Sequence, residues 1–560
     1  MNKIRIATTL LISVTFNILH GQTIIPGGYV SGEWTAAGSP YLVQGNLVVH
    51  PDSSLVVGPG TNVLFSGPYW LEVQGQLMAQ GTEVMQVQFD KDAGVEFWRG
   101  IYFNQTNNST MDSSLLVNCY IANCKQSPSI NLYKSNRVRI TACHITNGTA
   151  FNGGGINCIG SDLRMEEVTV DFCHALDGAG ISLEASSPYM VNCTITNNQA
   201  DGAGGGLVVY DGSDPLIENC LFSVNDSYGS GGGVYINASA PVFRRCQFNG
   251  NRGAIGGANF YSGGAVSVKL NSNPRFENCI FEDNQSYREG GAIASFSPTE
   301  IINCLFAGNM ALVSGGAVYV GAAGVIESPV HNCTFINNDS PQGSALASLN
   351  HKALLKNCIL WHQSPANPNS MIYLDAFLNS NILLVVHCDL QNGQQAIEKV
   401  PNAQYTWGQG NIDLEPEFEP GTWELSWKSP CIEAGTPDTI GLSLPETDLA
   451  GNPRFVNQIV DMGCYEYQFP VLIQNLEFKI QNPIRVYPNP ARDHVFVDAC
   501  EISGIHELII MNYSGSVVMS GKINSGDSMR IDLNGLPSGY YMIILRNKSS
   551  QYSGKFIIIQ

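Results

Sequence analysis

Short hydrophobic segments with a strict two-residue alternation recur through the middle of the chain. In residues 206–210, Leu207 and Val209 fall on one side of an extended strand, whereas Val208 and Tyr210 fall on the other. The same inward pairs recur at Val234 and Ile236, Val266 and Val268, and Val318 and Val320. No stretch between these segments carries ten or more residues at helical spacing. The pattern predicts an all-β chain built from short strands.

These strands belong to a two-part repeat that returns roughly every 27 residues. One part, which we call the glycine phrase, is a glycine pair followed by a small and then an aliphatic residue. It begins at Gly153, Gly178, Gly204, Gly231, Gly263, Gly290, Gly315 and, in degraded form, Gly343. The other part is a cysteine, a bulky apolar residue two positions later and often an asparagine three positions beyond that, as in residues 220–225, 279–284 and 304–309. Such a period indicates stacked units that bury one another. With three short strands per repeat and no crossover helices, we predict a right-handed parallel β-helix, a solenoid similar to that of pectate lyases.

An asparagine usually precedes the cysteine of each repeat. Ile217 and Phe222 are an odd number of positions apart, so both can face inward only if the chain bends between them, at Asn219. Asparagine enters the left-handed backbone region more readily than most residues. We therefore expect a bend column with stacked amides, made of Asn192, Asn219, Asn278, Asn303, Asn332 and Asn357.

Eleven of the 16 cysteines share one position of successive repeats: Cys119, Cys143, Cys173, Cys193, Cys220, Cys246, Cys279, Cys304, Cys333, Cys358 and Cys388. Stacked equivalents lie about 4.8 Å apart, whereas the Cβ atoms of a disulfide prefer about 3.8 Å. This spacing predicts a column of buried free thiols. Cys431 and Cys464 lie outside the column and are the best disulfide candidates.

Composition narrows the classes of function. Charged residues are only 13% of the chain and glycines number 58, which is typical of a turn-rich β protein. A net charge of −19 argues against nucleic acid and anionic membranes as partners. We expect no metal site and no cofactor; if the protein were a lyase, Ca²⁺ or another cation could serve to neutralise the uronate.

The chain divides into five predicted segments. Residues 1–21 resemble a secretory signal peptide, with Lys3 and Arg5 before an apolar run that is too short and polar to span a bilayer. The β-helix is predicted over 22–400, a closing module over 401–468, a linker over 469–484 and a separate β domain over 485–560. No other segment reaches eighteen apolar residues, so we predict no transmembrane segment.

Several motifs resemble known secreted β-helix proteins. Residues 27–103 are similar to the opening coils of such bacterial proteins, and the glycine phrase with phenylalanine-x-x-asparagine resembles repeats of polymorphic outer-membrane adhesins. Residues 411–416, 429–435, 448–454 and 460–466 look like the closing module of choice-of-anchor β-helix proteins. That resemblance implies a cap over the open edge of the sheets.

The last 76 residues closely resemble the type A C-terminal sorting domain of type IX secretion. The resemblance rests on residues 486–493, 507–515, 531–541 and 555–559. It implies an immunoglobulin-like β-sandwich, recognition by the type IX machinery and passage through the outer membrane. Removal of the domain would then leave the protein attached to the cell surface or released.

The sequence offers only a scattered set of candidate catalytic residues. Polygalacturonase-like enzymes would carry Asn-Thr-Asp, Asp-Asp and Gly-His-Gly in order, and none of these is present. Charged residues in loops before the glycine strands could converge on a substrate: Asp201, Asp226, Arg252, Arg288 and Glu289. A polysaccharide lyase or a glycoside hydrolase acting on acidic polysaccharide is therefore the alternative hypothesis.

The preferred hypothesis is a binding surface. Outward positions on the glycine strands carry Glu184, Tyr210, Tyr235, Lys269, Phe296 and Tyr319. Aromatic rings repeated at about 4.8 Å along a flat sheet could stack on sugar rings or bury in a partner, although they could equally pack beneath loops. We predict a secreted, surface-displayed, adhesin-like protein that binds extracellular polysaccharide or a host or neighbouring cell surface.

Overall fold

The protein is described as a computed structural model that covers residues 21–108, 113–257, 262–321, 326–363, 370–377, 380–456, 459–468, 484–498, 506–512, 517–523, 528–546 and 551–558. The predicted signal peptide and nearly all of the predicted linker lie outside these residues. Two compact units are present, residues 1–466 and 467–560. The described residues contain strands and three short 3-10 helices, η1 (Ala36–Gly38), η2 (Thr106–Asn108) and η3 (Gly393–Ala396).

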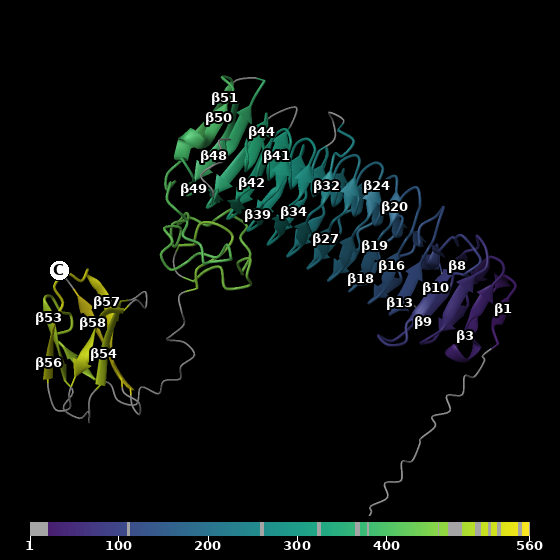
Figure 1. The fold of residues 1–560 in the computed structure, drawn as a ribbon, viewed down its shortest axis with the longest axis horizontal. Helices are drawn as coiled ribbons and strands as arrows, with labels where there is room; N and C mark the ends of the chain where they lie inside the picture. The colour runs from purple at the N-terminus through teal and green to yellow at the C-terminus, as the bar shows by residue number, and fades with distance from the viewer. Residues whose placement is uncertain are drawn as a thin grey trace, which may run out of the picture. The chain divides into compact units, whose positions relative to one another are not determined.

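The first unit is a parallel β-solenoid of stacked coils, each contributing one strand to each of three long parallel sheets (Figure 1). The first sheet consists of β1 (Thr23–Ile25), β4 (Tyr41–Val43), β7 (Asn62–Phe65), β10 (Val87–Lys91), β13 (Cys119–Ala122), β16 (His144–Thr146), β19 (Thr169–Asp171), β23 (Thr194–Thr196), β27 (Leu221–Ser223), β31 (Gln247–Asn249), β35 (Ile280–Glu282), β39 (Leu305–Ala307), β43 (Thr334–Ile336), β46 (Ile359–Trp361) and β49 (Asp389–Leu390).

The second sheet consists of β2 (Gly28–Tyr29), β5 (Leu47–Val49), β8 (Leu71–Val73), β11 (Ile101–Asn104), β14 (Ile130–Tyr133), β17 (Ile156–Ile159), β21 (Ile181–Glu184), β25 (Leu207–Tyr210), β29 (Val234–Asn237), β33 (Val266–Val268), β37 (Ile293–Ser295), β41 (Val318–Gly321), β44 (Leu346–Leu349), β47 (Ile372–Asp375) and β50 (Ile397–Lys399).

The third sheet consists of β3 (Gly32–Trp34), β6 (Ser54–Val57), β9 (Gln76–Gln80), β12 (Ser114–Val117), β15 (Val138–Thr141), β18 (Arg164–Glu166), β22 (Tyr189–Val191), β26 (Leu216–Glu218), β30 (Val242–Arg244), β34 (Arg275–Glu277), β38 (Glu300–Ile302), β42 (Glu327–His331), β45 (Lys352–Lys356), β48 (Ser380–Val386) and β51 (Ala403–Trp407). Because β51 completes the last coil, the solenoid runs past the boundary predicted at residue 400.

A fourth, short sheet was not predicted. It is formed by the two-residue strands β20 (His174–Ala175), β24 (Gln199–Ala200), β28 (Asp226–Ser227), β32 (Arg252–Gly253), β36 (Gln285–Ser286) and β40 (Met310–Ala311). These strands occur only in the coils that carry the glycine phrase, where they lie between the first-sheet strand and the glycine turn.

The inward positions predicted from the alternation form the core. Leu207, Val209, Val234 and Ile236 are fully buried. The six asparagines of the predicted bend column all have positive φ, between 50° and 56°, which confirms the bend that Asn219 was expected to make. Their side chains stack only in part, with direct amide bonds from Asn303 to Asn278 and from Asn357 to Asn332.

A continuous amide ladder is present in a different column. Six asparagines of this ladder are at most 2% exposed, and the side-chain NH₂ of each of the first five donates to the Oδ1 of the next at 2.9–3.0 Å: Asn198, Asn225, Asn251, Asn284, Asn309 and Asn338. Next to this ladder, the rings of Phe222, Phe248, Phe281, Phe306 and Phe335 stack nearly parallel at 4.6–5.2 Å. These residues are the phenylalanine-x-x-asparagine part of the repeat.

All eleven cysteines of the predicted column are buried free thiols, as expected. The two disulfide candidates, Cys431 and Cys464, are not bridged, because both are also buried free thiols. The Cys431 thiol lies 3.3 Å from Asp389 Oδ2, whereas Cys464 packs with Leu305 and Ala307. Each therefore anchors its segment to a different part of the solenoid.

The resemblance of the closing residues implied a cap over the open sheet edge, but these residues do more than cover that edge. Ile412 makes one bridge to Asp389 at the end of the first sheet, and the chain then turns back along the flank of the last coils. There it contacts the bend column: the Asn278 and Asn332 amides donate to the carbonyls of Thr447 and Asp461. The side-chain amides of these bend asparagines thus form hydrogen bonds that hold the closing segment on the flank.

The second unit contains two antiparallel sheets. One consists of β52 (Arg485–Tyr487), β53 (His494–Asp498) and β56 (Ser528–Asp532), and the other of β55 (Val517–Ile523), β54 (His506–Asn512), β57 (Gly539–Arg546) and β58 (Gln551–Ile558). Buried side chains from both sheets form one core. This arrangement agrees with the small β-sandwich predicted over 485–560. None of the described segments forms a helix that is long and apolar enough to cross a membrane.

Candidate functional site

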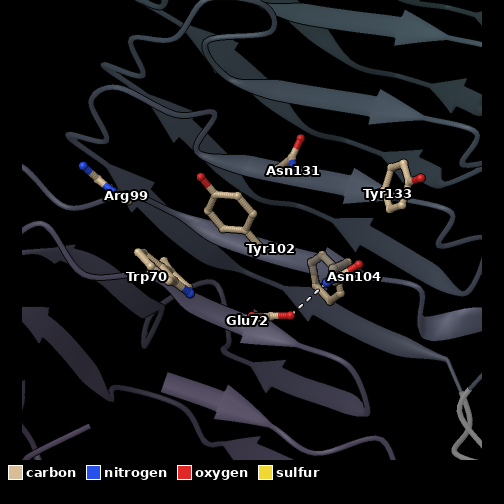
Figure 2. Close-up of a pocket in the computed structure, with 8 residues that line it drawn as sticks. Trp70, Glu72, Arg99, Tyr102, Asn104, Asn131 and Tyr133 are labelled. Carbon is tan, nitrogen blue, oxygen red and sulfur yellow. Dashed lines mark hydrogen bonds between the residues drawn. The ribbon is translucent and has the colours of Figure 1, made fainter. Parts of the chain in front are cut away.

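A hollow of about 360 Å³ opens on the outward face of the second sheet, in the first coils of the solenoid (Figure 2). Its lining combines aromatic rings with amide, carboxylate and guanidinium groups: Trp70, Glu72, Arg99, Tyr102, Phe103, Asn104, Asn131 and Tyr133. The volume lies at the lower end of the range typical of small-molecule sites. We call these eight residues the hollow.

Three adjacent strands position the hollow. Leu71, Ile101 and Ile130 pair across β8, β11 and β14 and face the core, so the residues that follow each of them face outward. Glu72, Tyr102 and Asn131 therefore stack in one outward row. Asn104 and Tyr133 stack in the neighbouring row, two positions further along the strands.

The polar groups of the hollow are held in place. Glu72 Oε1 accepts hydrogen bonds from Asn104 Nδ2 at 2.9 Å and from Gln74 Nε2 at 2.8 Å, which fixes the carboxylate (Figure 2). Asn131 Oδ1 accepts from Asn157 Nδ2 at 2.8 Å. The rings of Trp70 and Tyr102 lie 6.4 Å apart with their planes tilted by 54°. These rings offer two inclined apolar surfaces beside groups that can bond hydroxyls.

The outward row continues along the sheet beyond the hollow. Its members, in order, are Glu72, Tyr102, Asn131, Asn157, Ser182, Val208, Tyr235, Ser267, Ala294 and Tyr319, and we call them the outer row. From Ser182 onward most of these side chains are buried although they point away from the core.

The glycine turns explain this burial. Gly178 and Gly204 have positive φ, and a Cβ built on either would lie 2.5–2.6 Å from a methyl group of Val208. A Cβ built on Gly263 would lie 2.9 Å from the backbone nitrogen of Ser267, and one on Gly290 would lie 2.7 Å from that of Ala294. The glycine phrase thus folds a turn directly over the outer row. The first such turn, at Gly153, lies against Asn157, one position past the hollow.

The six predicted ligand-binding residues lie on this same face, and they form two clusters. Glu184 pairs with Tyr210 in the neighbouring row, and the rings of Tyr210 and Tyr235 meet edge to face at 5.7 Å. Further along, Lys269 Nζ lies 4.6 Å from the centre of the Phe296 ring. The Phe296 and Tyr319 rings are 5.7 Å apart.

Burial dominates the electrostatics of these clusters. It raises the pKa of both Tyr210 and Tyr235 and lowers the pKa of Lys269 to about 8. Tyr319 is only 8% exposed, so its predicted outward direction leaves little ring surface for a ligand. The middle of the face is therefore less accessible than the alternation alone indicated.

The five predicted catalytic residues lie in or next to the fourth-sheet strands. Arg252 forms a two-point ion pair with Asp226 on the adjacent coil, with Nε 2.8 Å from Oδ1. Asp201 lies 3.2 Å from His174, and Arg288 Nη2 lies 3.3 Å from Glu289, whose pKa is raised by burial. Each carboxylate thus faces a basic partner. A catalytic role for these residues remains a prediction.

Metal binding has no structural support within the described ranges, where no group of three or more His, Cys, Asp or Glu side chains could hold an ion.

Sequence reasoning missed the hollow. Five of its residues alternate with core residues along the strands, so the sequence carries a signal for them: Glu72, Tyr102, Asn104, Asn131 and Tyr133. These strands precede the first copy of the glycine phrase and lie outside the repeat on which the prediction rests.

Comparison with family models supports the architecture. A family model described as a right-handed β-helix region matches residues 99–272 and 204–359, and a model of the secretion system C-terminal sorting domain matches residues 485–560. A crystal structure of pectate lyase Pel9A is 13% identical, covers 76% of this chain and 88% of its own, and has a TM-score of 0.32. No curated protein matches the chain.

Proposed function

The chain is a right-handed β-helix protein that ends in a type IX secretion sorting domain, and from this premise we propose that it binds an extracellular polysaccharide through the second sheet. The sorting domain assigns the protein to the secreted or cell-surface class. The observation that carries the proposal is the hollow, where Trp70 and Tyr102 lie beside fixed amide and carboxylate groups.

Sugar recognition requires this combination. The apolar face of a pyranose ring packs on an aromatic ring, and its hydroxyl groups need donors and acceptors of fixed direction. Glu72 supplies an acceptor, and Asn104 and Asn131 supply amides. Because neighbouring strands repeat at about 4.8 Å, groups stacked along the sheet can contact successive units of one chain.

The test is retention of the full-length protein on a panel of charged and neutral polysaccharides, followed by titration with the polymer retained. We expect Trp70→Ala and Tyr102→Ala each to weaken binding about tenfold, which corresponds to roughly 1.4 kcal/mol for a lost aromatic contact. Tyr120→Ala is the matched control, because it removes a half-buried tyrosine from β13 in the first sheet at nearby coils. All three variants must keep the thermal midpoint of the wild type.

Failure of every polymer to bind would overturn the proposal, as would equal losses in the Tyr120→Ala control. The same panel tests the alternative of a lyase or glycoside hydrolase. Release of unsaturated products or new reducing ends from a bound polymer, abolished by Asp226→Ala or Arg288→Ala, would establish that activity instead.

A further inference from the structure

The hollow also contains a cation without a counter-ion. Arg99 is half-buried at its edge, and the only hydrogen bond that its guanidinium makes among the described residues is a long one, 3.4 Å, from Nη2 to Gln126 Oε1. Its buried Nε has no partner there, and no carboxylate lies within ion-pair distance in the described part of the chain. A second cation, Lys134, lies at the rim with its Nζ 5.0 Å from the centre of the Tyr133 ring.

This arrangement is unfavourable for the free protein. A guanidinium group stays charged at all accessible pH values and carries five N–H donors. Partial burial without a paired anion costs free energy. In a chain with a net charge of −19, carboxylates are abundant, yet among the described residues none pairs with Arg99.

The carboxylate of the hollow, Glu72, does not pair with Arg99. Figure 2 places Glu72, bonded to Asn104, and Arg99 on opposite sides of Trp70 and Tyr102. The two amide bonds to Glu72 leave its other oxygen as an acceptor for ligand hydroxyls. The site therefore has an acceptor end and a cationic end, with aromatic rings between them.

We propose that the hollow selects an acidic sugar. The ring of a uronic acid packs against Trp70 and Tyr102, its carboxylate pairs with Arg99, and its hydroxyls bond Glu72 and Asn104. A planar guanidinium matches a planar carboxylate in two parallel hydrogen bonds. Lys134 interacts with the carboxylate of a further unit. This inference rests on the proposed function and adds to it the class of sugar.

Two oligosaccharides that differ only in charge provide the test: a hexamer of β-1,4-linked mannuronic acid and the mannohexaose obtained when its carboxylates are reduced. We expect the full-length protein to bind the uronate at least tenfold more tightly, and added salt to weaken uronate binding alone. Arg99→Gln should remove most of that preference while leaving mannohexaose binding unchanged. Lys134→Gln should have a smaller effect in the same direction.

Arg139→Gln is the matched control. It removes the same charge from β15, on the third sheet, where the side chain is exposed, and should leave both affinities unchanged. Trp70→Ala should weaken both ligands, which separates ring stacking from charge recognition.

The outcomes distinguish the two proposals. Equal affinity for the two hexamers, a preference for the neutral one, or an unchanged preference in Arg99→Gln would overturn the acidic-sugar assignment and leave polysaccharide binding standing. Preferred binding of a sulfated polymer over the uronate would overturn the carboxylate assignment. If neither hexamer nor any polymer of the panel binds, the proposed function itself is wrong.

Discussion

The first coils and the middle coils share one sheet and one inward pattern, and they differ in what lies over the outward side. In the first coils, Glu72, Tyr102 and Asn131 line an open hollow. In the middle coils, the equivalent residues Val208 and Ala294 are fully buried, because glycine turns pack over them. The repeated glycine turns thus cover the outward face of the second sheet, and this face is open in the first coils, which lack the glycine phrase.

The two regions also differ in how their cores are packed. The middle coils stack identical side chains, the asparagine ladder beside a column of phenylalanine rings. The first coils rely on mixed aliphatic and aromatic packing, such as the Phe65 ring stacked on Trp98 at 4.3 Å. Exact repetition satisfies buried polar groups coil after coil. Among the described residues, the asparagine ladder begins at Asn198 and does not extend into the first coils, which carry the hollow.

The largest expected effect comes from breaking the ladder. Asn251→Leu removes four buried hydrogen bonds: two donated by Asn251 Nδ2, to Phe222 O and Asn284 Oδ1, and two donated to its Oδ1 by the Asn225 backbone and side chain. Since each buried polar group left unpaired costs about 1–3 kcal/mol, we expect a loss of more than about 4 kcal/mol. Asn131→Leu, in the open hollow, should cost less than about 1 kcal/mol.

A solenoid need not unfold in a single step, so the measurement is hydrogen exchange resolved by coil, together with the thermal midpoint. Protection should fall in the coils around Asn251 and remain unchanged in the first coils. Equal effects of the two substitutions would contradict the distinction between a ladder-dependent and a ladder-free region.

A smaller effect is expected from the glycine turns that cover the outer row. Gly204→Ala places a Cβ at a positive φ of 65° and 2.5 Å from both Leu207 O and Val208 Cγ1. We expect a cost of roughly 2 kcal/mol or more from backbone strain and overlap. Gly94→Ala is the control, because nothing lies within 4 Å of its Cβ, and it should leave the thermal midpoint nearly unchanged. A tolerated Gly204→Ala would show that the turn is not tightly packed on the row.

The sequence could predict the fold because the repeat is a local signal. The alternation of Leu207 and Val209, the spacing of the glycine phrase and the bend at Asn219 each follow from backbone geometry. The site could not be found in the same way. Whether Tyr102 is open and Tyr319 covered depends on whether a glycine turn packs over the row, as the turn at Gly315 does beside Tyr319, and the alternation along a strand does not report that packing.

The same limit explains the corrections. Cys431 and Cys464 are disulfide candidates in the sequence because both lie outside the column, but their positions are set by contacts of the closing segment with Asp389 and Leu305, which the sequence does not show. The correct amide ladder was visible as the asparagine of phenylalanine-x-x-asparagine. It was not recognised because the bend asparagines offered a simpler reason for an asparagine in each repeat.

The smallest expected effect concerns pH and separates the two regions as binding surfaces. Burial lowers the pKa of Lys269 in the middle coils to about 8, so this lysine loses its positive charge as the pH rises through that value. Arg99 in the hollow keeps its charge throughout. If the hollow binds the acidic sugar, the affinity of the full-length protein for the mannuronate hexamer should stay constant between pH 7 and about 9. A decline in affinity centred near pH 8 that is absent in Lys269→Gln would show that Lys269, in the covered middle of the sheet, binds the sugar carboxylate in place of Arg99. Titrations at constant ionic strength decide between the two, because salt would otherwise weaken either ion pair.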